Sequence, residues 1–312
     1  MNHIVTLCMN PCIDKAAHID HVVPERKLRC GIPRFYPGGG GINVSRAVGL
    51  LGGQSKALFP VGGPTGQMLL KLLEKEGVNA LPTEMKAWTR ENLIVYEQAT
   101  GQQYRFGMPG APMLESEWMT ILNRLEDLVP VPDYLVASGS LPRGVPADFF
   151  GLVAEIAKEK GTRCILDTSG EPLKKGLEAG VYLVKPNVRE LQDLSGKESM
   201  NESEQEVLAA DLIAGGGTKG VVLSLGSAGA MIVEAEGCRR LRAPTVPVRS
   251  KVGAGDSMVG GIVLGLVRGY SLVEAVRFGV AAGAAAVKSE GTELCRREDA
   301  DALYEYMRRK EE

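Results

Sequence analysis

One stretch of the sequence combines glycines, a carboxylate and the start of a helix. It runs from Lys251 to Gly261, and its small residues predict a helix from Met258 to about Val267. The first backbone N–H groups of a helix lack partners within it and attract anions. Asp256 stands among these donors, where it could take a proton from a hydroxyl, although the dipole is expected to lower its pKa. The stretch therefore predicts phosphoryl transfer, with an ordinary capped helix as the alternative.

A second glycine-rich loop lies closer to the N-terminus. Four consecutive glycines at 38–41 precede a helix that runs to Leu51 and stops at Gly52-Gly53. Because a glycine run costs backbone entropy, we expect a ligand to approach this loop, and a flexible connector is the alternative. Asn43 at the helix start either caps the helix or bonds a sugar hydroxyl.

Four cations occur in two polar segments with strand-like patterns. Lys27 and Arg29 lie in the first segment, and Arg90 and Arg105 lie near the ends of a hairpin predicted over 92–98 and 103–108. Together the four could hold a phosphate group. Taken singly, each is more often a solvated surface charge.

The rest of the chain alternates strands and helices. Apolar runs without alternation, such as 134–138 and 181–184, predict strands covered on both faces and hence a parallel sheet. We therefore predict an α/β fold, a doubly wound three-layer α/β/α arrangement with a mostly parallel sheet. It forms a single domain over 1–312, interrupted by small-sheet excursions at about 14–36 and 90–108. Ligands are expected at the carboxyl edge of the sheet, where strands end at Ser138, Asp167, Lys185 and Asn187.

Composition excludes several other classes of protein. The net charge of −2 over 312 residues gives no basic excess for nucleic acid, and no apolar run is long enough for a membrane span. Six cysteines without a Cys-x-x-Cys pair predict reduced thiols and a cytoplasmic location. Neither a P-loop nor a dinucleotide-binding motif is present, and the histidines at 3, 18 and 21 argue against a histidine base deep in the sheet.

The two glycine-rich stretches, 38–46 and 252–261, resemble the two signatures of the ribokinase-like (PfkB) carbohydrate kinases. The segment from Lys185 to Glu190 is similar to a third mark of that family. The segments around Arg29, Arg90 and Arg105 resemble its ATP-dependent 6-phosphofructokinases.

The resemblance implies transfer of the ATP γ-phosphoryl group to the 1-hydroxyl of fructose 6-phosphate. Glycine at position 40, where 1-phosphofructokinases usually carry lysine, favours this substrate. Tagatose-6-phosphate kinase and 1-phosphofructokinase are the alternatives, and a non-catalytic sensor of sugar phosphate or nucleotide is a third. The excursions match a β-sheet lid that pairs with another lid in a homodimer.

The resemblance also implies a role for each site residue. The expected base is Asp256, and the expected anion hole is formed by Gly253, Ala254 and Gly255. Sugar phosphate is expected to contact Asp14, Lys27, Arg29, Gly39, Gly40, Gly41, Asn43, Arg90, Arg105, Ser138, Gly139 and Ser140. ATP is expected to contact Lys185, Asn187, Ser224, Gly226 and Gly229, with Glu190 acting on Mg²⁺ through water. A K⁺ site is expected at Ser250, Val252, Ala286, Ser289 and Gly291, although Glu293 stands where arginine is expected.

Overall fold

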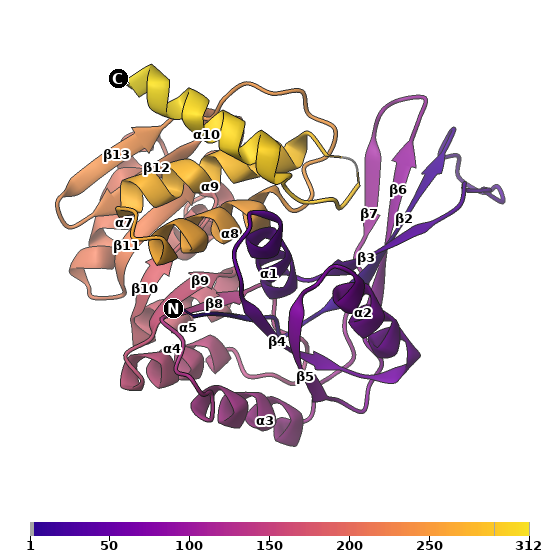
Figure 1. Ribbon diagram of the computed structural model, residues 1–312, viewed down its shortest axis with the longest axis horizontal. Coiled ribbons are helices and arrows are strands. Elements are labelled where there is room, and N and C mark those ends of the chain that lie inside the picture. Colours follow the sequence, from indigo (N-terminus) through magenta and orange to yellow (C-terminus); the bar gives the residue numbers. More distant parts are fainter. Residues whose placement is uncertain (1–2, 290, 312) are drawn as a thin grey trace.

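The strands form two sheets, one in the body of the molecule and one projecting from it (Figure 1). The computed structural model describes residues 3–289 and 291–311. The large sheet has nine strands: β1 (Ile4–Leu7), β4 (Lys56–Val61), β5 (Asn79–Glu84), β8 (Tyr134–Ser138), β9 (Arg163–Asp167), β10 (Val181–Val184), β11 (Thr218–Ser224), β12 (Ala230–Glu234) and β13 (Gly237–Leu241).

The strand order of the large sheet is that of a doubly wound fold. It runs β13-β12-β11-β10-β9-β8-β1-β4-β5, and neighbours are parallel except where β12 lies antiparallel to β11 and β13. The chain moves outward from β1 to β4 and β5, then returns to β8 on the other side of β1. The winding direction therefore switches between β1 and β8, and ligands in such folds bind beyond the carboxyl ends of the strands at the switch.

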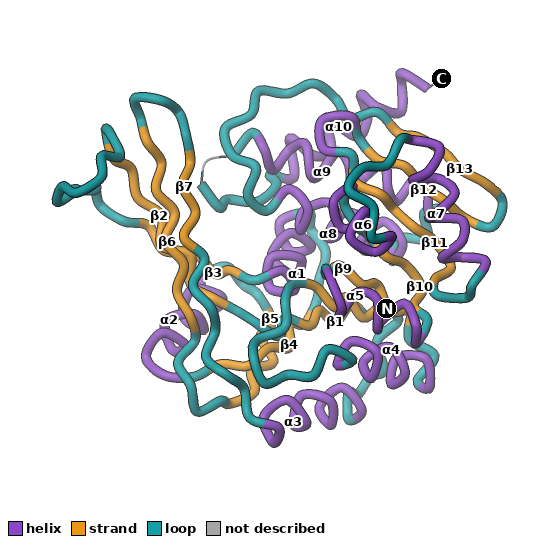
Figure 2. The backbone as a smooth tube through the Cα atoms, turned by 180° about the vertical axis from the view of Figure 1, so that it is seen from behind, coloured by secondary structure: helices purple, strands orange, loops and turns teal. Residues whose placement is uncertain are grey.

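Helices cover both faces of the large sheet, as the uninterrupted apolar strands predict (Figures 1 and 2). On β8, Val136 packs in one apolar core and its neighbour Leu135 packs in the other. The first core also contains residues of α1 (Gly40–Leu50), α8 (Ala254–Val267), α9 (Leu272–Val287) and α10 (Arg297–Glu311). The second contains residues of α3 (Glu115–Glu126), α4 (Phe149–Glu159), α5 (Gly170–Ala179), α6 (Val188–Ser195) and α7 (Glu202–Ala214). The predicted three-layer α/β/α fold is confirmed.

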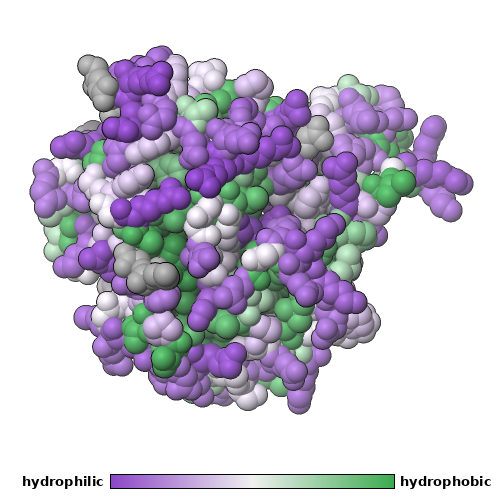
Figure 3. Space-filling model, viewed as in Figure 1, coloured by the Kyte–Doolittle hydropathy of each residue, from purple (hydrophilic) through white to green (hydrophobic). Residues whose placement is uncertain are grey.

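The small sheet projects from one end of the body (Figures 1 and 2). Its order is β3-β2-β6-β7, with β2 at Cys12–Ile19, β3 at Arg34–Gly38, β6 at Arg90–Glu97 and β7 at Gln103–Phe106. The antiparallel pairing of β6 and β7 confirms the predicted hairpin. A third apolar cluster, containing Ile13 of β2, Phe59 of β4 and Leu69 of α2 (Gly63–Lys75), joins this sheet to the body. Polar residues cover most of the face seen in Figure 3, including the projecting end.

Small residues let α8 and α9 lie in backbone contact. A Cβ atom added to Gly261 would lie 2.8 Å from Gly279 Cα, and one added to Gly279 would lie 2.7 Å from Met258 O. No side chain fits at either position without moving a helix. This contact fixes the helix whose N-terminus reaches the carboxyl edge of the sheet.

The structure departs from the sequence prediction at three elements. Helix α8 begins at Ala254, four residues before the predicted start, with Gly253 as its N-cap at φ 75°. Strand β5 and helix α10 were not predicted. Among the described residues, no helix is both long enough and apolar enough to cross a membrane.

Candidate active site

A polar cleft of about 330 Å³ opens beyond the carboxyl ends of β1, β8 and β9, with the small sheet as one wall. Most residues predicted to bind the sugar phosphate meet here. The lining residues are Cys8, Asn10, Cys12, Asp14, Gly39, Gly40, Asn43, Arg90, Asn92, Arg105, Ser138, Gly139, Ser140, Asp167, Thr168, Ser169, Glu190, Val252, Gly253 and Asp256.

Asp256 lies in the first turn of α8 and keeps part of its surface open to this cleft. The Asn43 side chain donates from Nδ2 to Asp256 Oδ2 at 2.9 Å. The pKa of Asp256 is raised to about 6. Loss of hydration is the largest cause and the Asp167 carboxylate adds to it, whereas Asn43, Lys185 and Arg105 oppose the rise. The expectation that the helix dipole lowers this pKa is wrong, because burial has the larger effect. Asp256 is thus a stronger base than expected.

Of the four cations predicted to hold a phosphate, two line the cleft and two do not. Arg105 lines the cleft from β7, and Arg90 lines it from β6. The Arg90 guanidinium already donates to Asn10 O at 3.0 Å and to Asn92 Oδ1 at 2.9 Å. By contrast, Lys27 and Arg29 are exposed between β2 and β3 and do not line the cleft.

Asp14 is buried in the cleft wall and is held by its neighbours on the small sheet. Asn92 donates from Nδ2 to Asp14 Oδ1 at 2.8 Å, and Cys12 donates from Sγ to the same oxygen at 3.3 Å. The sequence analysis missed Asn92. Its spacing of two from Arg90 on a strand, which places both side chains on one face, is the signal that could have found it.

The glycines at 38–41 are needed because other atoms of the protein lie close to their backbone. A Cβ atom added to Gly40 would lie 2.4 Å from Ser138 Oγ, and one added to Gly41 would lie 2.3 Å from Leu7 O. Gly39 has φ 109°, a conformation that side chains disfavour. The start of α1 therefore sits directly on the ends of β1 and β8. The predicted loop of Ser138, Gly139 and Ser140 is therefore in direct contact with the start of α1 and lines the same cleft.

Lys185 and Asp167 form a buried ion pair at the ends of β10 and β9. The distance from Lys185 Nζ to Asp167 Oδ1 is 3.1 Å, and Ser138 Oγ donates to Asp167 Oδ2 at 3.2 Å. Burial would lower the pKa of Lys185, but the Asp167 carboxylate raises it above its ordinary value. A Cβ atom added to Gly255 would lie 3.9 Å from Lys185 Nζ, so the ammonium stands beside the first turn of α8.

The third segment that resembles the kinase family, Lys185 to Glu190, contains the start of α6. Asn187 Oδ1 accepts from the Glu190 N–H at 2.9 Å, and Glu190 Oε2 accepts from the Asn187 N–H at 2.8 Å. This capping box is a structural role for both residues, while Glu190 also lines the cleft. Asn187 forms a bridge with Ser224, and Gly226 and Gly229 lie in the turn that follows. The residues predicted to bind ATP are therefore adjacent, and their role stays a prediction.

The residues predicted to bind K⁺ form one hydrogen-bonded loop region. Ser250 Oγ donates to Gly291 O at 2.6 Å, and the Val252 N–H donates to Ser250 Oγ at 3.2 Å. The Ser289 N–H donates to Ala286 O at 3.0 Å. Within the described ranges, no three His, Cys, Asp or Glu side chains form a group that could hold a metal.

Comparison with known proteins gives consistent results across the chain. Residues 2–299 match the model of the pfkB family carbohydrate kinases. The chain is 44% identical over 310 residues to ATP-dependent 6-phosphofructokinase isozyme 2 of Escherichia coli (strain K12), covering 99% of this chain and 100% of that protein.

Two solved structures of phosphofructokinase-2 from Escherichia coli share the fold. The complex with potassium has a TM-score of 0.95 at 44% identity, covering 99% of this chain and 100% of that chain. The complex with substrates and products has a TM-score of 0.94 at 44% identity, covering 98% and 99%. The similarity therefore extends over the body and the small sheet together.

Proposed function

The chain belongs to the pfkB family of carbohydrate kinases, and from this we propose that it is an ATP-dependent 6-phosphofructokinase. It transfers the γ-phosphoryl group of ATP to the 1-hydroxyl of fructose 6-phosphate, giving fructose 1,6-bisphosphate and ADP. The observation that carries the proposal is the position of Asp256. A base, a helix N-terminus for a transferring phosphoryl group and Arg105 for the sugar's own phosphate share one cleft.

Asp256 acts as the base on the 1-hydroxyl. A carboxylate with a pKa of about 6 is ionised at pH 7 and still basic enough to accept a proton late in the reaction. Gly253 caps α8 without a side-chain hydrogen bond, so the first N–H groups of the helix point to the cleft. The backbone N–H groups of Gly253, Ala254 and Gly255 form the anion hole for the phosphoryl group during its transfer.

The sugar phosphate is bound by residues from both sheets. Asp14, Asn43 and the Ser138 loop hold the sugar hydroxyls, and Arg90 and Arg105 hold the 6-phosphate. We propose that the small sheet is a lid over the cleft and that two lids pair in a homodimer. Lys27 and Arg29 are exposed and do not line the cleft of their own subunit. In the proposed dimer they would reach the cleft of the second subunit.

ATP is bound next to the cleft, beyond Asp167 and Glu190, by the adjacent residues Lys185, Asn187, Ser224, Gly226 and Gly229. Magnesium usually keeps its waters and binds one or two carboxylates together with substrate phosphates. Glu190 and Asp167, two carboxylates that line the cleft, fit this preference, with Glu190 acting through water. The ion supplies charge neutralisation of the phosphates. The loop around Ser250 and Gly291 is proposed to hold K⁺. Cytoplasmic location stays a prediction.

The alternatives are kinases of tagatose 6-phosphate or fructose 1-phosphate. Lysine at position 40 would mark the second, but a side chain there meets Ser138, so this site is built around glycine. A non-catalytic sensor on the same fold is the third alternative. Against it, Asp256 and Glu190 both line the cleft, and Lys185 pairs with Asp167, which also lines it.

A coupled assay of ADP release with MgATP tests the proposal. Fructose 6-phosphate, tagatose 6-phosphate, fructose 1-phosphate, fructose and ribose are run side by side. We expect the highest kcat/KM for fructose 6-phosphate. A preference for either other phosphosugar would replace the substrate, and no turnover with any of them would favour the sensor.

A further inference from the structure

An ion pair outside the cleft, between the buried Arg46 and the partly exposed Glu76, is connected by hydrogen bonds to Asp256. We propose that Arg46 is a positioning residue that turns the Asn43 amide toward Asp256 and is itself held in place by Glu76. The inference rests on the proposed role of Asp256 and assigns two residues that touch neither substrate.

The orientation of the Asn43 amide decides what Asp256 faces. Asn43 Nδ2 donates to Asp256 Oδ2, and Asn43 Oδ1 accepts from Arg46 Nη1 at 3.0 Å. A guanidinium has donors only, so it can face only the oxygen of an amide. Arg46 thereby fixes the NH₂ end toward the carboxylate. Reversal of the amide would place its oxygen against Asp256 and leave the N–H groups of Arg46 facing NH₂.

Arg46 has little freedom to move. Its side chain is 5% exposed, and Nη1 also donates to Pro37 O at 3.0 Å. Nε and Nη2 donate to the two carboxylate oxygens of Glu76, at 2.5 and 3.0 Å. This two-pronged contact requires the planar fork of arginine, which lysine lacks. Glu76 directly follows α2, so its backbone comes from a different element than that of Arg46.

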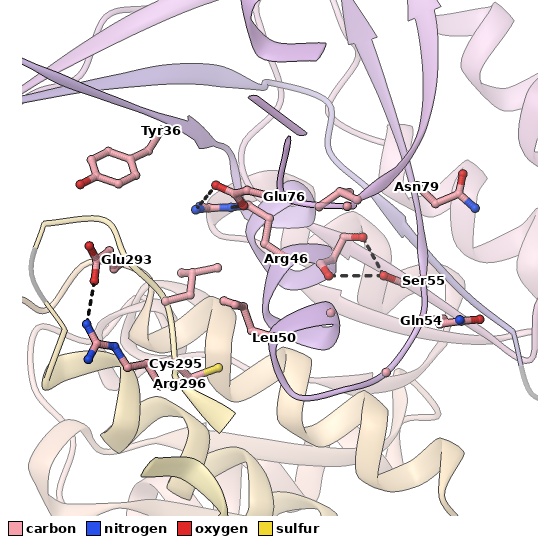
Figure 4. Close-up of a pocket in the computed structure, with 16 residues that line it drawn as sticks. Tyr36, Arg46, Leu50, Gln54, Ser55, Glu76, Asn79, Glu293, Cys295 and Arg296 are labelled. Atoms are coloured by element: carbon pink, nitrogen blue, oxygen red, sulfur yellow. Dashed lines mark hydrogen bonds and ion pairs between the residues drawn. The ribbon is translucent and has the colours of Figure 1, made fainter. Parts of the chain in front are cut away.

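Arg46 and Glu76 act from outside the cleft. Neither lines it, and both line a separate cavity of about 600 Å³ (Figure 4). In Figure 4 the two side chains meet in front of α1, and Tyr36 and Glu293 lie on the far side of this cavity. The two cavities share no described lining residue. The side-chain contacts of Glu76 with Arg46, and of Arg46 with Asn43, connect Glu76 to the cleft.

Other groups around Asp256 set its charge but are not changed by altering the Arg46 pair. Asp167 raises the pKa of Asp256, and Lys185 and Arg105 lower it. Asn43 also lowers it, through the hydrogen bond that Arg46 fixes. Loss of that orientation is thus expected to move Asp256 toward its protonated form.

The test is the pH profile of kcat/KM for fructose 6-phosphate in Arg46→Lys and Glu76→Gln. Lysine also has donors only, but it lacks the planar fork that Glu76 holds by two bonds, so its ammonium is not fixed opposite Asn43 Oδ1. In Arg46→Lys we therefore expect the acidic limb to move up by about one pH unit. On top of any loss common to all pH values, kcat/KM then falls about fivefold at pH 6 and hardly at pH 8. Glu76→Gln keeps one acceptor and is expected to shift in the same direction by less. It also covers the case in which Arg46→Lys fails to fold.

A second readout does not depend on activity. A ¹³C NMR titration of aspartate-labelled protein follows the Asp256 carboxyl, assigned by its loss in Asp256→Asn. We expect its midpoint to rise in both variants. This keeps the inference testable should the proposed substrate prove wrong.

Arg277→Gln is the matched control. Arg277 also forms a buried ion pair, with Glu274 on α9, but it does not line the cleft. We expect lower thermal stability without a shift of the acidic limb. An equal loss of kcat/KM at every pH in the Arg46 and Glu76 variants, with an unchanged Asp256 titration, would overturn the inference and leave the pair a structural one.

Discussion

Replacing Asp256 with asparagine should inactivate the enzyme and stabilise the fold. The pKa of Asp256 is about 6 against an ordinary value of 3.8, a difference that corresponds to about 3 kcal/mol. Because the folded-state pKa is the higher one, the folded protein binds this proton more tightly than the unfolded chain. The free energy of unfolding therefore falls as the pH rises from about 4 to 6, and the full cost is present at pH 7.

Asparagine removes the charge and keeps the shape. Its Oδ1 still accepts from Asn43 Nδ2, so we expect most of the cost to be recovered, which corresponds to a rise in Tm of several °C at pH 7. The loss of the base should lower kcat by about 10² to 10⁴. The two effects oppose each other, as in other active sites built around a buried charge.

The assay is thermal unfolding of both proteins between pH 4 and 8, together with kcat at saturating substrate. The gain in Tm should nearly vanish at pH 4, because Asp256 is protonated in the folded wild type and roughly half protonated in the unfolded chain. Near-normal kcat would refute the role of Asp256 as the base. A Tm at pH 7 equal to or below that of the wild type would refute the claim that its charge is costly.

Four further variants test the cleft and the ion pair beside it. Arg105→Ala should raise the KM for fructose 6-phosphate at unchanged Tm, since this exposed side chain lines the cleft. Arg90→Ala should raise the KM and also lower Tm, because Arg90 donates a hydrogen bond to Asn10 O. Equal Tm values for the two variants would contradict this difference. Gly40→Ala should lower kcat/KM at least tenfold because its Cβ meets Ser138, and wild-type kinetics would show that the loop moves. Lys185→Met should leave Asp167 buried without its cation and lower Tm, which calorimetry measures directly.

The sequence predicts the layers of this fold better than its edges. Strands covered on both faces, such as Tyr134–Ser138, carry an apolar run that local pattern identifies. Strand β5 (Asn79–Glu84) contains a proline and few buried residues, because it lies at the edge of the sheet beside β4 alone. The early start of α8 at Ala254 was missed because glycines disfavour a helix, and only its packing on α9 overrides that preference.

The candidate site shows the same limit. Asp256, Asn43 and the glycine loops could be selected from residue type and spacing. The raised pKa of Asp256 could not, because burial by segments far along the chain produces it. Asn92 was missed, and Asp167 was expected at the carboxyl edge of the sheet without a role of its own. Each acts by contacting another side chain, a relation that spacing alone does not reveal.

The cavity of about 600 Å³ that Arg46 and Glu76 line offers a way to inhibit the enzyme without competing with either substrate. Its walls include Glu76, whose side chain is about a third exposed, and they share no described residue with the cleft. A small molecule seated there and pairing with Glu76 would compete with Arg46 for the carboxylate, and neither high ATP nor high sugar phosphate would displace it. Such a compound would lower the maximal rate at unchanged KM, and fragment screening against this cavity is a direct way to find one.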